Sequence, residues 1–364
     1  MSGGLRRLLA ALVVVLFVVA PTAAAAAPPP TSTSVAPPPP PPRAWVLVDG
    51  DTGAVIEGGH ERDPQRVASV FKVLTAVALL ENLDLASDVS VSARAEGMPA
   101  RKINLKEGQT WKASDLMHAL LLVSANDAAV ALAEQAAGTL EGFGGMLDAT
   151  ATRLGMADHP TLRDPAGLDD EFSVGGGNLV SARDLAIATR AFLSYPELTE
   201  IVAEPVYRFD GGDGNPHRLL NHNLLLKTYP GAIGVKTGYT KRAGHSLIGA
   251  ARRDGRTMIA VAVGAADPNR SVAALLDKGF ATPLAAEAGM DHLPPVVHGS
   301  ARDPVTNAAP PARSVATPAT ASRHSRTLPL PSNTVPSLVL LVVGGGPGIV
   351  ILARRSRSRL ARAL

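Results

Sequence analysis

The sequence predicts an α+β fold in which both ends of the folded part contribute strands to one sheet. Residues 44–59 (AWVLVDGDTGAVIEGG) place two short apolar runs around a DGDTG turn, the pattern of a β-hairpin. Residues 231–240, 246–255 and 256–265 have the pattern of three consecutive strands, and a DGR turn joins the last two. Between these two ends the spacing of the apolar residues favours helices.

Four segments predict helices in chain order. Residues 67–83 form a strongly apolar run, and residues 114–136 read as one helix, a break and a second helix. Residues 181–195 predict a helix that begins after Ser181, which is a suitable N-cap residue. Residues 271–281 predict a closing helix after the last strand. We therefore expect a helical middle between a hairpin and a three-stranded meander.

Composition restricts the chemistry. The chain has 364 residues, of which 46% are hydrophobic and only 4% aromatic, so Ala, Val and Leu must fill the core. It contains no cysteine, which excludes a thiol nucleophile, disulfides and cysteine-ligated zinc.

The basic character of the chain resides at its two ends. Lys plus Arg number 35 and Asp plus Glu number 32, and the two ends hold seven arginines and no acid. The remainder has 28 basic and 32 acidic residues, a balance of −4. These arginines are typical of membrane topology signals, so we expect no nucleic-acid partner. They are Arg6, Arg7, Arg354, Arg355, Arg357, Arg359 and Arg362.

The N-terminal segment predicts export. Residues 1–27 have the layout of a signal peptide, with a positive start, the apolar run LLAALVVVLFVVA and small residues suited to cleavage. Residues 28–43 are rich in proline and predict an extended spacer.

The C-terminal segment predicts a membrane anchor. We expect the catalytic domain at residues 44–287 and a disordered, Pro/Ala/Ser/Thr-rich stalk at residues 288–335. Residues 336–353 carry no charge and are just long enough for a transmembrane helix, and residues 354–364 form a basic tail. These patterns predict a single-pass protein of the cell membrane with its catalytic domain on the extracytoplasmic side.

The first chemical motif is Ser69-Val70-Phe71-Lys72, an S-x-x-K sequence at the start of the predicted apolar helix. Positions i and i+3 lie on the same helical face, so the Lys72 amine can reach the Ser69 hydroxyl. Burial in this apolar surrounding would depress the lysine pKa and let the amine accept the serine proton. Taken alone, this spacing favours an ordinary amphipathic serine beside a lysine, because so short a motif also arises by chance.

Two further motifs follow. Ser124-Ala125-Asn126 lies at the predicted helix break, where the hydroxyl and the amide can serve a peptide substrate or simply cap a helix. Lys236-Thr237-Gly238 lies on a predicted edge strand, where a cation and a hydroxyl suit a carboxylate. Gly238 would allow a substrate backbone to approach closely. Alone, this last motif is also compatible with a solvated strand end.

Together, S-x-x-K, S-x-N and K-T-G in this order resemble the signature of penicillin-binding proteins and serine β-lactamases. Residues 66–76, 103–134 and 234–256 are similar to low-molecular-weight D-alanyl-D-alanine carboxypeptidases. The resemblance spans residues 44–281 and implies a sheet flanked by helices beside an all-helical lobe, with the site in the cleft between them. One departure is the Gly-rich run in residues 171–186, which differs from the more usual His/Tyr-containing segment.

This resemblance implies a chemical role for four residues. Ser69 would be the nucleophile, and Lys72 would be its base as a neutral amine. Ser124 would pass the proton to the leaving amine. The backbone N–H groups of Ser69 and Tyr239 would form the oxyanion hole.

It also implies how the substrate binds. Asn126 would hold the peptide, while Lys236 and Thr237 beside Gly238 would bind its terminal carboxylate. The implied reaction removes the terminal D-alanine of peptidoglycan stem peptides, β-lactam antibiotics being covalent inhibitors. No cofactor and no metal are expected.

Three alternatives remain. A class A β-lactamase would need a further carboxylate, usually in an E-x-x-L-N segment, and none lies between Asn126 and Lys236. A metallopeptidase would need clustered ligands, but there is no H-E-x-x-H, and His217 and His222 have no evident third partner. A non-catalytic peptidoglycan-binding module would ordinarily have lost at least one reactive residue.

Overall fold

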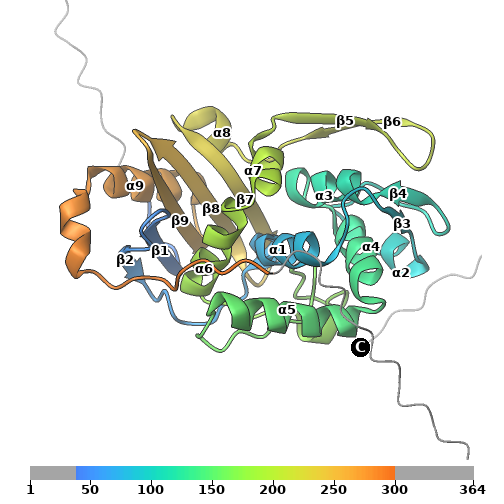
Figure 1. Ribbon diagram of the computed structural model, residues 1–364, viewed down its shortest axis with the longest axis horizontal. Helices are drawn as coiled ribbons and strands as arrows, with labels where there is room; N and C mark the ends of the chain where they lie inside the picture. Colours follow the sequence, from blue (N-terminus) through green and yellow to red (C-terminus); the bar gives the residue numbers. More distant parts are fainter. Residues whose placement is uncertain (1–37, 300–364) are drawn as a thin grey trace, which may run out of the picture. The chain divides into compact units, whose positions relative to one another are not determined.

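The fold is that of a computed structural model, which describes residues 38–299 of the chain. A mixed arrangement of one main sheet and many helices confirms the predicted α+β class (Figure 1). The segments that we predicted as signal peptide (1–27), transmembrane helix (336–353) and basic tail (354–364) lie outside the described residues. Within residues 38–299, no helix has both the length and the apolar character needed to cross a membrane.

The main sheet has five antiparallel strands in the order β2-β1-β9-β8-β7. The N-terminal hairpin and the C-terminal meander meet where β1 pairs with β9, so both ends of the domain build one sheet, as predicted. Strand β7 forms one edge of this sheet. The strands are β1 (Ala44–Asp49), β2 (Val55–Gly59), β7 (Ala232–Thr240), β8 (Gly244–Arg253) and β9 (Arg256–Ala265).

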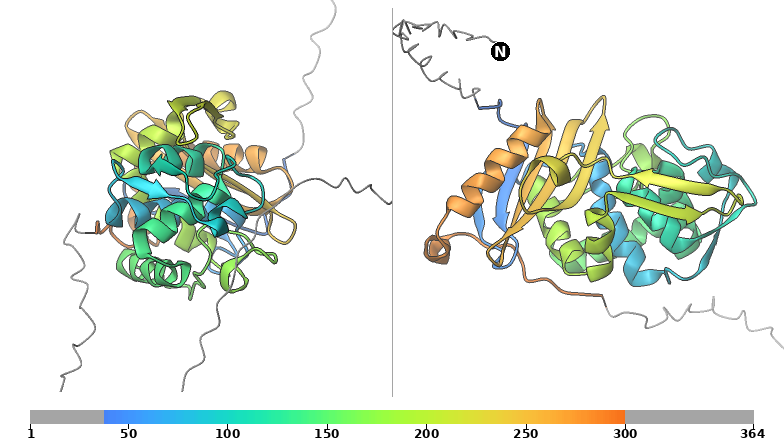
Figure 2. Two further views of the ribbon diagram at one scale, coloured as in Figure 1. Left: turned by 90° about the vertical axis from the view of Figure 1, so that its right-hand side faces the viewer. Right: turned by 90° about the horizontal axis from the view of Figure 1, so that it is seen from above.

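Helices cover both faces of this sheet, which explains why its central strands are apolar on both sides (Figure 2). Helix α6 (Ala182–Leu193) packs against β1 and β9 from one face, and α9 (Pro268–Ala281) packs against β1, β8 and β9 from the other. Successive residues of β9 therefore alternate between two cores: Val261 joins the core shared with the helical lobe, and Ala260 joins the core under α9.

The helical lobe is built around α1 (Lys72–Asn82), which contacts α3, α4, α5 and α6. A short 3-10 turn, η1 (Ala68–Phe71), precedes α1, so the helix predicted from residue 67 begins as a tighter turn. The predicted break is present, because α3 ends at Leu122 and α4 begins at Asn126. The other helices of the lobe are α2 (Ala93–Glu96), α3 (Ala113–Leu122), α4 (Asn126–Ala137) and α5 (Leu140–Leu154).

Several short elements were not predicted. Two small hairpins have strands of three to five residues, too short for a clear period in the sequence, and the longer one projects over the helical lobe (Figure 1). These hairpins are β3 (Asp88–Ser90) with β4 (Thr110–Lys112), and β5 (Val206–Asp210) with β6 (Pro216–Leu220). The remaining elements are η2 (Val174–Gly176), α7 (Pro196–Ala203), α8 (Leu225–Thr228) and η3 (Leu284–Gly289).

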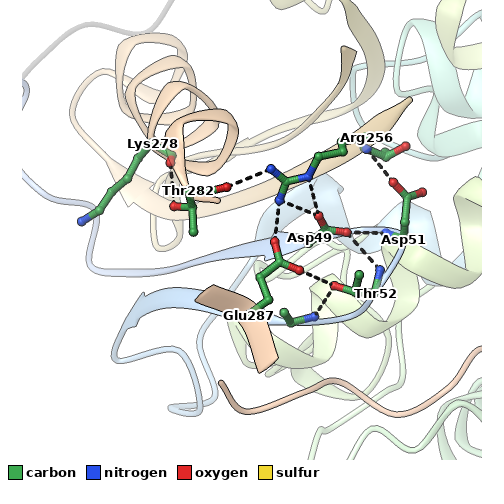
Figure 3. Close-up of polar contacts among 9 residues, drawn as sticks. Asp49, Asp51, Thr52, Arg256, Lys278, Thr282 and Glu287 are labelled. Carbon is green, nitrogen blue, oxygen red and sulfur yellow. Dashed lines mark hydrogen bonds and ion pairs between the residues drawn. The ribbon is translucent and has the colours of Figure 1, made fainter. Parts of the chain in front are cut away.

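A buried polar network ties η3 to the sheet (Figure 3). The carboxylates of Asp49 and Glu287 are almost fully enclosed, and the guanidinium of Arg256 lies between them. It contacts Asp49 Oδ2 at 3.0 Å. Thr52 Oγ1 donates to Glu287 Oε2 at 2.9 Å. Because an unpaired buried carboxylate is costly, this network fixes η3 against β1 and β9.

The expected end of the domain at residue 287 is wrong. Residues 288–299, which we assigned to the stalk, continue along the domain instead. Leu293 is buried and its N–H donates to Gly53 O at 2.8 Å, while Arg190 Nη1 donates to Pro294 O at 2.7 Å. Gly299 N donates to Glu81 Oε1 at 3.1 Å. A buried leucine, hydrogen bonds to its backbone and an ion pair hold this segment, and composition does not reveal such contacts.

We predict that Leu293→Ala lowers the free energy of unfolding by about 2–5 kcal/mol, because it leaves a cavity under the C-terminal segment. Leu284→Ala is the matched control: Leu284 is 56% exposed, so its loss should cost less than about 0.5 kcal/mol. Urea denaturation of the two variants measures both values. Equal stability of the two variants would mean that residues 288–299 do not pack as described.

Candidate active site

The turn that carries Ser69 lies directly against the edge strand β7. Ala68 has a φ of 58°, and this left-handed conformation leads into η1 and α1. A Cβ at Gly238 would lie 3.0 Å from the Ser69 N and 2.9 Å from the Val70 N. Gly238 thus permits close approach, but the backbone that approaches it is the protein's own Ser69 turn. The S-x-x-K and K-T-G motifs are in contact through this glycine.

The Lys72 amine is buried at the start of α1 and has three polar neighbours. Its Nζ lies 3.0 Å from Ser69 Oγ, 2.9 Å from Asn126 Oδ1 and 2.5 Å from Ala166 O. The amide oxygen of Asn126 and the carbonyl of Ala166 only accept hydrogen bonds. A neutral amine would therefore give its two hydrogens to these oxygens and keep its lone pair for the Ser69 hydroxyl.

Burial lowers the pKa of Lys72 from 10.5 to about 7, while the negative charges of Asp164 and Asp127 partly oppose this shift. Loss of water disfavours the charged ammonium more than these two carboxylates favour it. A substantial fraction of Lys72 is consequently neutral near pH 7. The structure thus brings together a serine hydroxyl and an amine that can accept its proton.

The S-x-N motif lies at the break between α3 and α4. Ser124 has a φ of 63°, which interrupts the helix and allows Asn126 to begin α4. Asn126 joins two parts of the site, because its Oδ1 contacts Lys72 and its Nδ2 donates to Pro99 O at 3.1 Å. The Ser124 hydroxyl is almost enclosed, yet within residues 38–299 it has no hydrogen-bond partner. It is therefore free to bond to a molecule in the cleft.

The K-T-G motif lies on the edge strand, as predicted. Thr237 and Tyr239 line the cleft, and Tyr239 is 59% exposed. Lys236 is instead buried, and its Nζ donates to Thr237 O at 3.0 Å. Its pKa lies well below the usual lysine value because burial, followed by the charges of Lys72 and Arg101, disfavours the ammonium. The two lysines of the motifs thus lie beneath the cleft surface.

A single cavity of about 410 Å³ brings most of these groups together. Six of the eight predicted site residues line it, namely Ser69, Ser124, Asn126, Thr237, Gly238 and Tyr239. Lys72 and Lys236 are buried behind it. We had not assigned the six other lining residues to this site: Ala100, Arg101, Leu168, His222, Thr240 and His245. Each comes from a loop or strand end that only the tertiary fold brings to the cleft.

The loop that follows α5 presents Ala166 to Lys72. Asp164 Oδ1 accepts hydrogen bonds from the N–H groups of Ala166 at 2.9 Å and Leu168 at 3.0 Å, and its Oδ2 accepts one from Val174 at 2.9 Å. Asn178 completes the loop, since its Oδ1 accepts from Asp164 N at 2.9 Å. We did not predict this role of Asp164, because it depends on three backbone N–H groups and belongs to no sequence motif. The bond from Val174 ties the unusual Gly-rich run to this loop.

The two histidines that we considered as metal ligands have different partners. His217 contacts Asp213 and stacks on Phe209 of the β5–β6 hairpin, whereas His222 contacts Arg101. Across residues 38–299, no group of three or more His, Asp or Glu side chains is arranged to hold a metal ion.

Comparison with known proteins agrees with this geometry. The sequence profile of the D-alanyl-D-alanine carboxypeptidase family matches residues 31–267. A D-alanyl-D-alanine carboxypeptidase of Mycobacterium tuberculosis, DacB2, is 36% identical over 217 residues, which span 60% of this chain and 72% of that protein.

Solved structures agree as well. A crystal structure of a D-alanyl-D-alanine carboxypeptidase from Mycobacterium tuberculosis H37Rv has a TM-score of 0.63 and 33% identity, and the match covers 69% of this chain and 96% of that one. Penicillin-binding protein D2 of Listeria monocytogenes, solved in an ampicillin-bound form, has a TM-score of 0.57 and 26% identity, with 66% and 97% coverage. This chain belongs to the family of D-alanyl-D-alanine carboxypeptidases, penicillin-binding serine hydrolases of peptidoglycan metabolism.

Proposed function

We propose that this chain removes the terminal D-alanine from peptidoglycan stem peptides through an acyl-enzyme on Ser69. The observation that carries the proposal is the buried Lys72 amine, whose Nζ lies 3.0 Å from Ser69 Oγ and whose pKa is about 7. A serine hydroxyl is a weak nucleophile until a nearby base takes its proton, and Lys72 is such a base.

In the first step, the Ser69 hydroxyl gives its proton to the lone pair of Lys72 while its oxygen attacks the carbonyl carbon between the last two D-alanines. Negative charge then develops on the carbonyl oxygen. Backbone N–H groups of Ser69 and Tyr239 are our candidates for stabilising it, since fixed donors of this kind contribute strongly to the rate. The absence of a side chain at Gly238 allows these two segments to lie this close together.

In the second step, the bond to the leaving amine breaks. The amine needs a proton, and Ser124 is the proposed carrier from Lys72, because its enclosed hydroxyl lines the cleft and has no partner in the described part of the chain. D-Alanine then departs, water attacks the Ser69 ester, and Ser69 is regenerated. Asn126, already bonded to Lys72, would hold the peptide through its amide.

One observation favours a peptidase over a β-lactamase. No Asp or Glu is among the described residues that line the cleft. The nearby carboxylate of Asp164 accepts three backbone N–H groups, and that of Asp169 accepts the Thr240 hydroxyl at 2.7 Å. Neither carboxylate lines the cleft, where it could activate a water molecule beside Ser69. A β-lactam ester at Ser69 should therefore hydrolyse slowly, as expected for an inhibitor.

We also propose that the catalytic domain works outside the cell membrane and is tethered to it. The support is in the sequence: residues 1–27 have the layout of a signal peptide, and the uncharged residues 336–353 precede a basic tail. Such a tether would keep the domain near its cell-wall substrate.

Ser69→Ala should abolish the covalent adduct with penicillin, because the attacking oxygen is lost. Intact-mass spectrometry should show one adduct on the wild-type chain and none on the variant, and peptide mapping should place it on Ser69. Ser173→Ala, a serine that does not line the cleft, should keep the adduct. An adduct on any residue other than Ser69 would overturn the assignment.

Lys72→Arg should fold but acylate orders of magnitude more slowly, since a guanidinium stays charged at any usable pH and cannot act as a base. In the wild-type chain the acylation rate should rise with pH through about 7, because the neutral amine increases as the pH passes the pKa of Lys72. Below that pKa the rate should fall about tenfold per pH unit. Stopped-flow acylation measures both effects, and a flat profile or a fully active arginine variant would exclude Lys72 as the base.

A further inference from the structure

The first turn of α4 fixes a loop at the mouth of the cleft. Asn126 N donates to Arg101 O at 2.7 Å, and Asn126 Nδ2 donates to Pro99 O. On the other side of Arg101, the buried carboxylate of Asp127 accepts the N–H groups of Ile103 at 3.0 Å and Leu105 at 3.1 Å. The backbone of Arg101 is therefore hydrogen-bonded to Asn126, which also contacts Lys72.

The Arg101 side chain lines the cleft and lacks an acidic partner. Its Nη1 lies 3.2 Å from His222 Nδ1, and no carboxylate of the described residues pairs with it. Burial, and then the charges of Arg101 and Lys236, lower the pKa of His222, so the neutral ring accepts the guanidinium hydrogen bond. Arg101 and His222 also line an adjoining cavity of about 450 Å³, which leaves the guanidinium accessible.

Arg101 differs in this respect from the two lysines of the motifs. Lys72 and Lys236 are buried and do not line the cleft, and the Lys236 ammonium already donates to Thr237 O. Among the residues that line the cleft in the described structure, Arg101 is the one permanent cation, and no lining residue is acidic. An arginine presents a planar fork of donors that matches a carboxylate.

We propose that Arg101 is a specificity-determining residue that directly binds the terminal carboxylate of the peptide. The proposal rests on the proposed peptidase function and assigns the direct ionic contact to Arg101, whereas Lys236 contributes from beneath the surface and Thr237 through its hydroxyl. The location supports this carboxylate rather than another, because Arg101 lines the same cavity as Ser69 and Thr237. Lys236 lies behind that cavity, and the charge of Arg101 disfavours its ammonium. A carboxylate between Arg101 and Lys236 would relieve that repulsion.

The test compares two peptides that end in D-Ala-D-Ala, one with a free terminal carboxylate and one with a terminal amide. For the full chain, Arg101→Gln should lower kcat/KM for the free peptide about ten- to a hundredfold and change the amidated peptide less than about threefold. Arg208→Gln is the charge-matched control. Arg208 is an exposed residue of β5 outside the cleft, so its loss should alter neither value.

An equal loss on both peptides, or no loss on either, would overturn the proposal. Acylation of Ser69 by a β-lactam and by its carboxylate ester measures the same discrimination without peptide hydrolysis. A wild-type chain that acylates but releases no D-alanine would contradict the proposed function and leave Arg101 testable by this second readout. If Arg101→Gln slows acylation by the acid and the ester equally, Arg101 does not bind the carboxylate.

Discussion

The site depends on one constraint, the burial of the Lys72 amine. A lysine in water would hold its proton near neutral pH and could not activate Ser69. Here α1 starts inside the domain, and the amine is satisfied by Ser69, Asn126 and the carbonyl of Ala166. These contacts satisfy the hydrogen-bonding groups of a neutral amine, whereas the loss of water disfavours the charged ammonium. The elements that surround Lys72 are therefore the elements that make the serine reactive.

Asn126 and Asp164 explain how distant segments reach this amine. Asn126 begins α4 only because the chain breaks at Ser124, and from that position it bonds both Lys72 and the loop before it. Asp164 folds the loop after α5 through three backbone N–H groups, which directs the carbonyl of Ala166 toward Lys72. Gly238 allows the edge strand β7 to lie close against the Ser69 turn. The Ser69 turn, the start of α4 and the loop after α5 thus share one polar cluster around Lys72.

The sequence predicted the features that depend on local spacing. The S-x-x-K pair lies on one helical turn, the helix break and the N-cap at Ser181 follow from residue type, and the joining of both ends in one sheet follows from their strand-like patterns. It did not predict that Arg101 and His222 line the cleft or that Asp164 orders a loop beside it, because these roles arise from tertiary contacts. It also placed the end of the domain too early, since the packing of Leu293 depends on a partner far away in the chain.

The reactivity of Ser69 requires that Lys72 loses its proton near neutral pH in the folded protein. The most direct measurement is an NMR titration of the side-chain signal of ¹³C-labelled Lys72, assigned by its absence in a variant that lacks this lysine. We expect a titration midpoint near 7, well below the ordinary 10.5. A midpoint that stays close to 10.5 would contradict it, because Ser69 would then have no neutral amine to receive its proton.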